Sequence, residues 1–407
     1  MTAETLALIA AVHSKVPPAE APGTSLRVET VSDPATFTAM RGPWSQLLAE
    51  SRSNTVFLTW EWLHSWWRHL AGDRRLALLT VRRAGELVAI APFAASRNRW
   101  LGLSTLEFLG TGRVGSDYLD MIIRRGEEAE TLQTLTDHVV RGAAVMDLRQ
   151  VLASSASRRM ASALRRSGCS IRARRTHRAL FIDLRGLSFE AYLAGLGSQH
   201  RYNFQRRLRK LESSPGFAFE CASSPARRAE VLKMLFELHR LRWEGRGGDG
   251  LVGQGVQEFH EEFSTLALER GWLRLFVLWL DGAPAATLYA FRHGSVFSFY
   301  QSGFDPRFSK LSVGLVALGL AIKSAIGEGA REFDLLHGVE PYKFHWASES
   351  RSLSRVVTFP PSALGRTLWS GSTAVEGLRD VKRGLKNIWT ARPFRRRIGG
   401  THAAPSC

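Results

Sequence analysis

The feature of this chain that most constrains its fold is a pattern that occurs twice. Each copy has an aspartate, a helical stretch, a Gly-Ala pair and an Asp-Leu pair, in that order. The positions are Asp117, Gly142-Ala143 and Asp147-Leu148 in the first copy, and Asp305, Gly329-Ala330 and Asp334-Leu335 in the second. The two aspartates are 30 residues apart in one copy and 29 in the other. A helix that ends at glycine before a strand is common in α/β proteins, but the shared order and spacing favour a duplicated module.

Helical and strand patterns alternate in both halves. Hairpins are expected at 76–93, around Gly85, and at 273–291, where Asp281-Gly282 is a strong two-residue turn signal. Further strands are expected at 106–109, 118–123, 145–151, 296–303 and 332–336. Helices are expected at 39–50, 59–70, 127–141, 157–167, 189–212, 225–243, 257–270 and 312–326. We therefore predict a mixed α/β (α+β) fold of two tandem modules, each a mixed sheet flanked by helices.

The length of 407 residues suggests two to three domains. Residues 1–25 contain three prolines and resemble a flexible leader. We expect an N-terminal half at 26–187, a C-terminal half at 188–358 and a basic tail at 359–407, in which short docking helices around Leu368 and Leu385 remain an option.

The net charge of +18 is unevenly distributed, because residues 351–407 hold eleven Lys and Arg against two acids. Such a field attracts anions: nucleic acid, an anionic membrane surface, or phosphorylated small molecules. Composition alone does not choose among them, and a GC-rich genome would also enrich arginine.

Cysteine usage and hydropathy indicate the compartment. Cys169, Cys221 and Cys407 are far apart and odd in number, so neither a disulfide framework nor a zinc site is expected. The longest apolar stretch, Leu311–Ile322, is shorter than the about 20 residues that a membrane span needs. No signal peptide pattern is present at the N-terminus. We expect a cytoplasmic protein with no transmembrane segment and no metal.

A candidate phosphate cradle follows the strand at 296–303. Small and polar residues lie between this strand and the next helix, where free N–H groups and the helix dipole favour anions. The residues suited to this role are Ser309, Lys310, Ser312, as helix N-cap, and Gly314. An ordinary capped helix with a surface lysine would give the same pattern.

Several motifs resemble the CelD/BcsL-type family of GNAT-fold acetyltransferases, named for members in cellulose-biosynthesis gene clusters. The matching segments lie in order over about 30–350, and they are Phe57–Trp62 with Trp66-Trp67, Gly85–Phe93, Leu238–Trp243, Tyr300–Pro306 and Glu340–Trp346. The resemblance implies two tandem GNAT-like (acyl-CoA N-acyltransferase) modules, as in the related Fem-type aminoacyl-tRNA-dependent transferases. It implies acetyl-CoA or another acyl-CoA as donor and leaves the acceptor open: an amine or hydroxyl of a cell-envelope, exopolysaccharide (glycan) or small-molecule compound.

One segment departs from the family pattern. The GNAT pyrophosphate loop usually reads Gln/Arg-x-x-Gly-x-Gly/Ala, whereas Arg307–Gly314 lacks the first glycine. A bulkier acyl donor or an aminoacyl-tRNA donor therefore stays open.

Acyl transfer needs a base, a group that polarises the thioester carbonyl, and an acid for the leaving thiolate. The candidate bases are Asp334, His337, Glu340 and His345. The resemblance points to Tyr342 as the acid and to Lys343 as a partner of a phosphate, of a carboxylate such as Glu340, or of a polarised carbonyl. Asp334 could equally be structural, because Asp147 occupies the same repeat position.

Acceptor-binding candidates are His239, Arg242 and Trp243 on one helix, together with Gln301 and Asp305 near the cradle. A helix that merely packs on the core is the alternative for the first three. The tryptophans at 60–67 are expected to be core residues, not a sugar-stacking surface. The basic run Arg206–Lys210, near Tyr202 and Phe204, is typical of a solvated helix face, but it could also bind a tRNA acceptor arm.

Three functions remain open from the sequence. The first is CoA-dependent acyl transfer, and the second is aminoacyl-tRNA-dependent transfer, which the basic charge favours. The third is a non-catalytic module of a polysaccharide-synthesis complex, which the departure in the phosphate loop favours.

Overall fold

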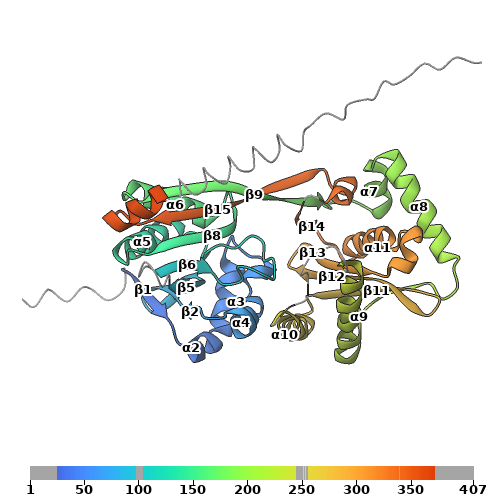
Figure 1. Ribbon diagram of the computed structural model, residues 1–407, viewed down its shortest axis with the longest axis horizontal. Coiled ribbons are helices and arrows are strands. Elements are labelled where there is room, and N and C mark those ends of the chain that lie inside the picture. Colours follow the sequence, from blue (N-terminus) through green and yellow to red (C-terminus); the bar gives the residue numbers. More distant parts are fainter. Residues whose placement is uncertain are drawn as a thin grey trace, which may run out of the picture.

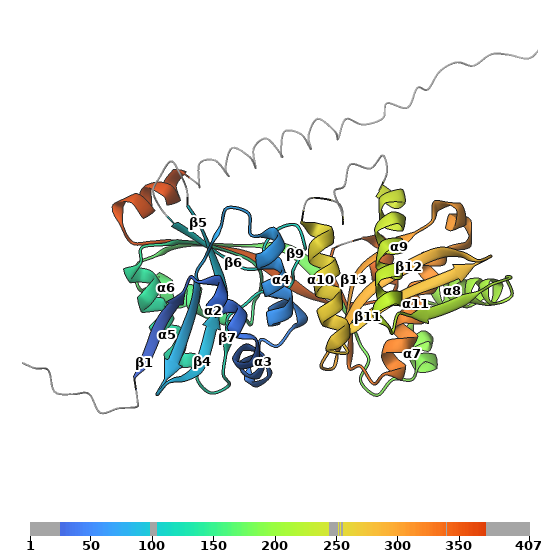
Figure 2. The same cartoon turned by 90° about the horizontal axis from the view of Figure 1, so that it is seen from below.

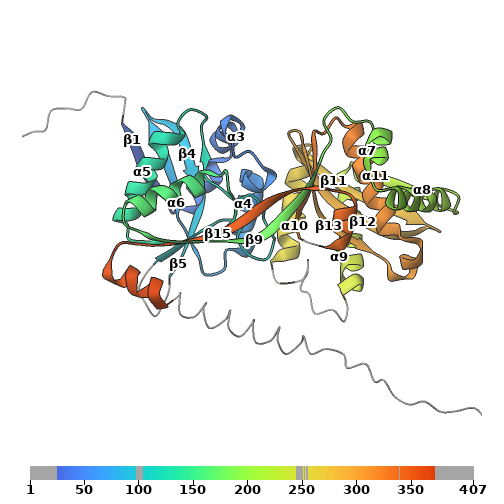
Figure 3. The same ribbon diagram turned by 90° about the horizontal axis from the view of Figure 1, so that it is seen from above.

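The computed structural model describes residues 25–97, 104–243, 251, 253, 255–338 and 340–371. Residues 26–187 and 188–358, named here the N-terminal and C-terminal halves, lie side by side and are joined by two long strands (Figures 1 and 3). No helix in the described ranges has the length and apolar character needed to cross a membrane.

The N-terminal half consists of helices packed on strands, which Figure 2 shows from below. Its elements are β1 (Leu26–Val31), α2 (Pro34–Ala39), α3 (Arg41–Glu50), the 3-10 turn η2 (Val56–Leu58), α4 (Trp60–Leu70), β2 (Arg75–Leu76), β3 (Leu78–Arg83), β4 (Glu86–Ala91), β5 (Phe93–Arg97), β6 (Ser104–Phe108), β7 (Ile122–Ile123), α5 (Glu128–Arg141), β8 (Val145–Leu152), α6 (Ala156–Arg166) and β9 (Ser170–Asp183). Pro92 separates β4 from β5, and its missing N–H explains why the chain changes from one sheet to another there.

The C-terminal half follows the same plan. Its elements are α7 (Phe189–Gly195), α8 (Ser198–Glu212), β10 (Ala218–Cys221), α9 (Pro225–Trp243), α10 (Val256–Glu269), β11 (Leu273–Leu280), β12 (Ala283–His293), β13 (Val296–Phe304), η3 (Pro306–Leu311), α11 (Val313–Gly327), β14 (Glu332–His337), η4 (Pro341–His345) and β15 (Glu349–Phe359).

Strand pairing confirms the duplication. In each half an antiparallel hairpin leads to a strand, a crossover helix and a parallel strand: β6, α5 and β8 in the first, and β13, α11 and β14 in the second. Asp147 on β8 and Asp334 on β14 therefore occupy equivalent strands. Each of these strands also pairs antiparallel with one of the two long strands. The fold is thus mixed α/β with two tandem modules, as predicted.

The two long strands, β9 and β15, pair with each other over eleven residue pairs and belong to both halves. In the N-terminal half β15 pairs with β8, and in the C-terminal half β9 pairs with β14, so the order reads β14-β9-β15-β8. The result is one eleven-stranded sheet that runs through the molecule, beside a four-stranded sheet of β1, β3, β4 and β7.

The sequence reading missed some elements and placed others wrongly. β1, β9 and β15 were not anticipated, because arginines interrupt the apolar alternation of the two long strands. The strand expected at 118–123 is confined to β7, since Tyr118 adopts a positive φ of 57° that a strand does not allow. The helix expected at 39–50 is divided at Met40, and the one at 189–212 breaks at Leu196-Gly197.

The halves share one hydrophobic core. Trp62 of α4 is fully buried, and its ring packs edge-on against Phe259 and Phe263 of α10 and against Tyr300 of β13. Trp60 and Trp66 are also buried, and Trp67 is half-buried and packs against the same core. The expectation that these tryptophans form core and not a sugar-binding surface is confirmed.

Close packing fixes α11 against α8 and η4. A Cβ on Gly319 of α11 would lie 2.6 Å from Cζ of Phe204 and 2.9 Å from Cη2 of Trp346, both of which are buried rings. Only glycine therefore allows the three elements to approach this closely.

We expect Gly319→Ala to lower the free energy of unfolding by about 1–3 kcal/mol, the usual cost of overpacking a core. Gly327→Ala, in the same helix with open space around it, is the control and should stabilise the fold slightly. Urea unfolding of both variants measures this, and equal stability of the two would contradict the packing argument.

Candidate active site

The candidate site lies where β13 and β14 separate. The two strands pair in parallel only from Val296 to Ser298 and from Glu332 to Asp334. Beyond this point each strand carries an irregularity: β13 has one extra residue, Tyr300, opposite β12, and Leu336 of β14 has a positive φ of 56°. Such bulges bend a strand and end its pairing, so the strands diverge toward Phe304 and His337.

An apolar cleft of about 180 Å³ opens on the α11 side of this separation. Its lining comes from β12, β13, the first turns of α11 and η4, and consists of Ala286, Thr287, Leu288, Phe299, Ser302, Gly303, Phe304, Gly314, Leu315, Ala317, Leu318, Tyr342 and Trp346. Two of the residues singled out in the sequence, Gly314 and Tyr342, thus face the same cleft.

The expected phosphate cradle forms a 3-10 turn instead of an open loop. Ser312 occupies the N-cap position of α11, as expected, but its backbone lies in the left-handed region (φ 57°) and its hydroxyl makes no capping hydrogen bond. Ser309 and Lys310 lie in η3 outside the cleft lining, and the Lys310 carbonyl accepts a hydrogen bond from Arg207 of α8 at 3.3 Å.

A glycine-rich loop of the N-terminal half, residues 110–118, covers the opposite side of the separated strands. Tyr300 Oη donates to the Val114 carbonyl at 2.6 Å. A Cβ on Gly115 would lie 3.3 Å from Cε1 of His337. This loop therefore contacts both β13 and β14.

The same loop carries Asp117, which binds His337 through two hydrogen bonds. The His337 ring nitrogen Nδ1 and the His337 backbone N–H both lie 2.8 Å from the Asp117 carboxylate. Because a carboxylate accepts the Nδ1 proton, the neutral ring has its lone pair on Nε2. Gln150 of β8 also donates to Asp117 at 3.1 Å, and its oxygen lies 3.1 Å from Nδ1 of His177.

The electrostatics of this pair favour a basic histidine. Burial opposes the charged ring of His337, but the hydrogen bond that the ring donates to Asp117 and the negative charge of Asp117 outweigh burial and raise the His337 pKa above its usual value. The Asp117 side chain itself is fully buried. A histidine oriented by a buried carboxylate is an arrangement suited to general-base catalysis.

Lys343 fastens the segment that follows β14. Its ammonium group is almost completely buried, lies 3.1 Å from the Glu340 carboxylate and donates to the His337 carbonyl at 2.9 Å. A carboxylate partner such as Glu340 was one of the options that the sequence left open. The contact with His337 links Lys343 directly to the residue that Asp117 orients.

Asp334 lies away from the cleft. Its carboxylate accepts the Leu336 N–H at 2.8 Å and is 3.4 Å from Arg351. Burial raises its pKa to about 7. Its neighbours Phe333 and Leu335 pack in the core beneath α11, and strand alternation therefore turns Asp334 toward the N-terminal half.

The remaining candidates are dispersed. His239 is buried where α9 packs on β13, 2.7 Å from the Cβ position of Gly303. Asp305 caps η3 and pairs with Arg307 at 2.6 Å. His345 stacks on His200, with ring centroids 5.2 Å apart. Gln301 is half-buried on β13. The side chains of Arg242 and Trp243 lie outside the described residues.

The sequence reading named His337 as one possible base but missed its partners. Asp117 entered only as a marker of the repeat, and Gln150 and His177 were not singled out. The one available signal was the density of glycines at 110, 112 and 115, all of which have positive φ. Among the described residues, no group of three or more His, Cys, Asp or Glu is arranged to hold a metal.

Residues 198–344, which contain His337 and all of the cleft lining except Trp346, match a family model described as acetyltransferase (GNAT) domain. The C-terminal half contains a GNAT domain. No curated protein shows a significant match to the chain.

Solved structures resemble this fold across both halves. FemX aligns with a TM-score of 0.57 at 11% identity, covering 81% of this chain and 96% of that one. The C-terminal domain of a putative lysylphosphatidylglycerol synthetase from Agrobacterium fabrum aligns with a TM-score of 0.52 at 10% identity, covering 83% and 96%. A protein of unknown function from Bacteroides thetaiotaomicron gives 0.50 at 12% identity, covering 82% and 100%. At these identities the likeness concerns the fold alone.

We expect Asp117→Asn to lower the pKa of His337, because burial then acts without the opposing carboxylate charge. The ring resonances of His337, followed by NMR across pH, measure the change. Asp137→Asn, on an exposed part of α5, is the control and should leave the value unchanged. An unaltered His337 pKa in Asp117→Asn would rule out the coupling.

Proposed function

We propose that this protein is an acyltransferase that takes an acyl group from an acyl-CoA, such as acetyl-CoA, and passes it to an amine or hydroxyl. The observation that carries the proposal is the GNAT-matching half, in which an apolar cleft and an oriented histidine lie at the same separation of two strands. The donor would extend along the cleft from the start of α11, and the acceptor would approach from the side of the glycine-rich loop.

In this proposal the amine nitrogen or hydroxyl oxygen of the acceptor attacks the thioester carbon, and His337 Nε2 accepts the proton that this atom loses. The carbon–sulfur bond breaks, and the thiolate takes a proton from Tyr342, which lines the cleft. Lys343 and Glu340 act as positioning residues, because Lys343 donates to the carbonyl of His337 and Glu340 binds the Lys343 ammonium group. General-base assistance of this kind contributes roughly a hundred- to ten-thousandfold in rate.

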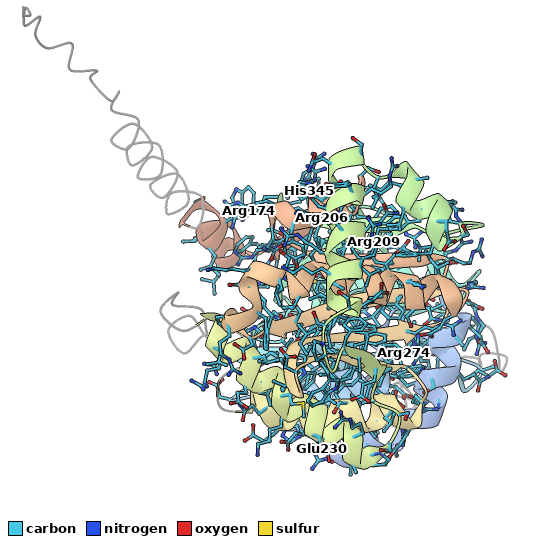
Figure 4. All side chains as sticks on the ribbon, turned by 90° about the vertical axis from the view of Figure 1, so that its right-hand side faces the viewer. Arg174, Arg206, Arg209, Glu230, Arg274 and His345 are labelled. Atoms are coloured by element: carbon cyan, nitrogen blue, oxygen red, sulfur yellow. The ribbon has the colours of Figure 1, made fainter. Side chains whose placement is uncertain are left out.

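A second candidate is aminoacyl-tRNA-dependent transfer. It is favoured by α8, on which Tyr202 is exposed. Figure 4 shows Arg206 and Arg209 on the same helix, and both are exposed. Arg206 lies over the Tyr202 ring at 5.9 Å, whereas Phe204 is buried and unavailable for stacking. The CelD-type assignment, a role in polysaccharide synthesis and a cytoplasmic location remain proposals. Residues 372–407 of the basic tail, where membrane or partner binding was expected, lie outside the described residues.

Calorimetry with acetyl-CoA tests the proposed donor site, because a cleft with a purely structural role would not bind this molecule. Gly314 lines the cleft at the first turn of α11, and we expect Gly314→Glu to weaken binding at least about tenfold by repelling the phosphates. An acidic residue near a helix N-terminus does not destabilise the helix, so the fold should persist. Gly314→Ala is the matched control and should bind normally. Absence of binding by the wild type, with tight salt-sensitive tRNA binding instead, would favour the second candidate.

We expect Lys343→Ala to lower turnover roughly ten- to a thousandfold, the scale of one lost positioned electrostatic contact. The charge of Lys343 lowers the pKa of His337, so the acidic limb of the rate profile should also move to higher pH in this variant. Lys323→Ala, on the exposed side of α11, is the control. Acyl transfer and melting temperature are measured together, and a loss of activity that merely follows unfolding would return Lys343 to a structural role.

A further inference from the structure

A second cavity, of about 330 Å³, is lined by elements of both halves and by His337, which does not line the apolar cleft. The glycine-rich loop, β8, β9, β14 and β15 all contribute to its wall. Its charged or titratable lining residues are Arg149, Arg174, Arg355, His177 and His337. The cavity is near the small end of the range for ligand pockets, roughly 300–1,000 Å³.

The lining of this cavity has an excess of positive charge. Its described lining contains three guanidinium groups and no carboxylate. Behind the wall, Asp147 binds two of them, Arg355 at 2.6 Å and Arg149 at 2.8 Å. The other nearby carboxylate, Asp117, is already bound by His337 and Gln150. One carboxylate therefore serves two arginines, and Arg174 adds a further positive charge.

The position of Arg174 on β9 directs its positive charge to the cavity. It lies on β9 beside Thr176, and both side chains line the cavity. Within the described part of the chain, no carboxylate forms an ion pair with Arg174. The pairing of β9 with β15 shifts register between His177 and Arg175, and this irregularity lets Arg174, Thr176 and His177 all face the cavity despite strand alternation.

We infer that this cavity binds the acceptor and that the acceptor carries an anionic group, a carboxylate or a phosphate, besides the amine or hydroxyl that is acylated. For the amine or hydroxyl that is acylated, this inference rests on the proposed function, because His337 in the same wall would receive the proton of that group. Arg174, with Arg149, would bind the anion, since planar guanidinium groups match both carboxylate and phosphate. A small polar acid fits this space, and Arg174 determines specificity without touching the reacting atoms.

The test uses binding, so it does not depend on any donor. Ring resonances of His177 and His337 are followed by NMR while inorganic phosphate, and separately acetate, is added to the full-length protein at constant pH and ionic strength. We expect saturable shifts with at least one of the two anions. Arg174→Gln should weaken that binding about tenfold, the scale of one charge-assisted hydrogen bond.

Arg175→Gln is the matched control, because Arg175 neighbours Arg174 on β9, is also exposed and does not line the cavity. Shifts with phosphate alone would identify a phosphate-bearing acceptor, and shifts with acetate alone a carboxylate-bearing one. No saturable shift with either anion, or equal weakening in Arg174→Gln and Arg175→Gln, would overturn the inference. Failure of acetyl-CoA binding would instead remove the proposed activity and leave the anion site standing.

Discussion

The structure depends on the antiparallel ladder between β9 and β15, because neither half completes its sheet without it. The central strand β8 pairs on one side with residues 353–358, which come from the far end of the described chain. Its counterpart β14 pairs with residues 179–183, which come from the N-terminal half. A buried strand with unpaired N–H and C=O groups is costly, so the exchange of strands makes folding of one half contingent on the other.

This exchange also decides where chemistry can occur. With the halves fixed, Trp62 enters the aromatic core around Tyr300, and its ring N–H donates to Ser116 of the glycine-rich loop at 2.8 Å. The loop is then held against β13 and β14, and Asp117 reaches His337 over a sequence distance of 220 residues. The proposed base therefore needs both halves, because the GNAT-matching segment contains His337 but not Asp117, which orients it.

The repeat could be predicted from sequence because it is local: a helix, its C-terminal glycine and the next strand leave a pattern within about 30 residues. Gly314 was singled out from an equally local pattern of strand, loop and helix, whereas Tyr342 came from the family resemblance. Asp117 could not be assigned, because its partner is distant and an isolated aspartate after glycines also fits a turn. Ser312 occupies the N-cap position that its residue type suggested, but it makes no side-chain capping bond, and its backbone is left-handed instead of extended. β9 was missed because tertiary pairing, not apolar alternation, stabilises a strand that carries four arginines.

The same reasoning explains why the net charge of +18 was a poor guide to partners. Many arginines form ion pairs with neighbouring carboxylates. Arg83 lies between Glu127 and Glu130, and Arg274 pairs with Glu328. The acids of these pairs are already subtracted in the net charge, so the pairs do not lower it, but they determine where in the molecule positive charge is compensated and where it is not. What attracts a ligand is the local excess that pairing leaves behind. Between the halves that excess adjoins His337, the proposed base, and our proposal is that it selects the acceptor there as well as binding it.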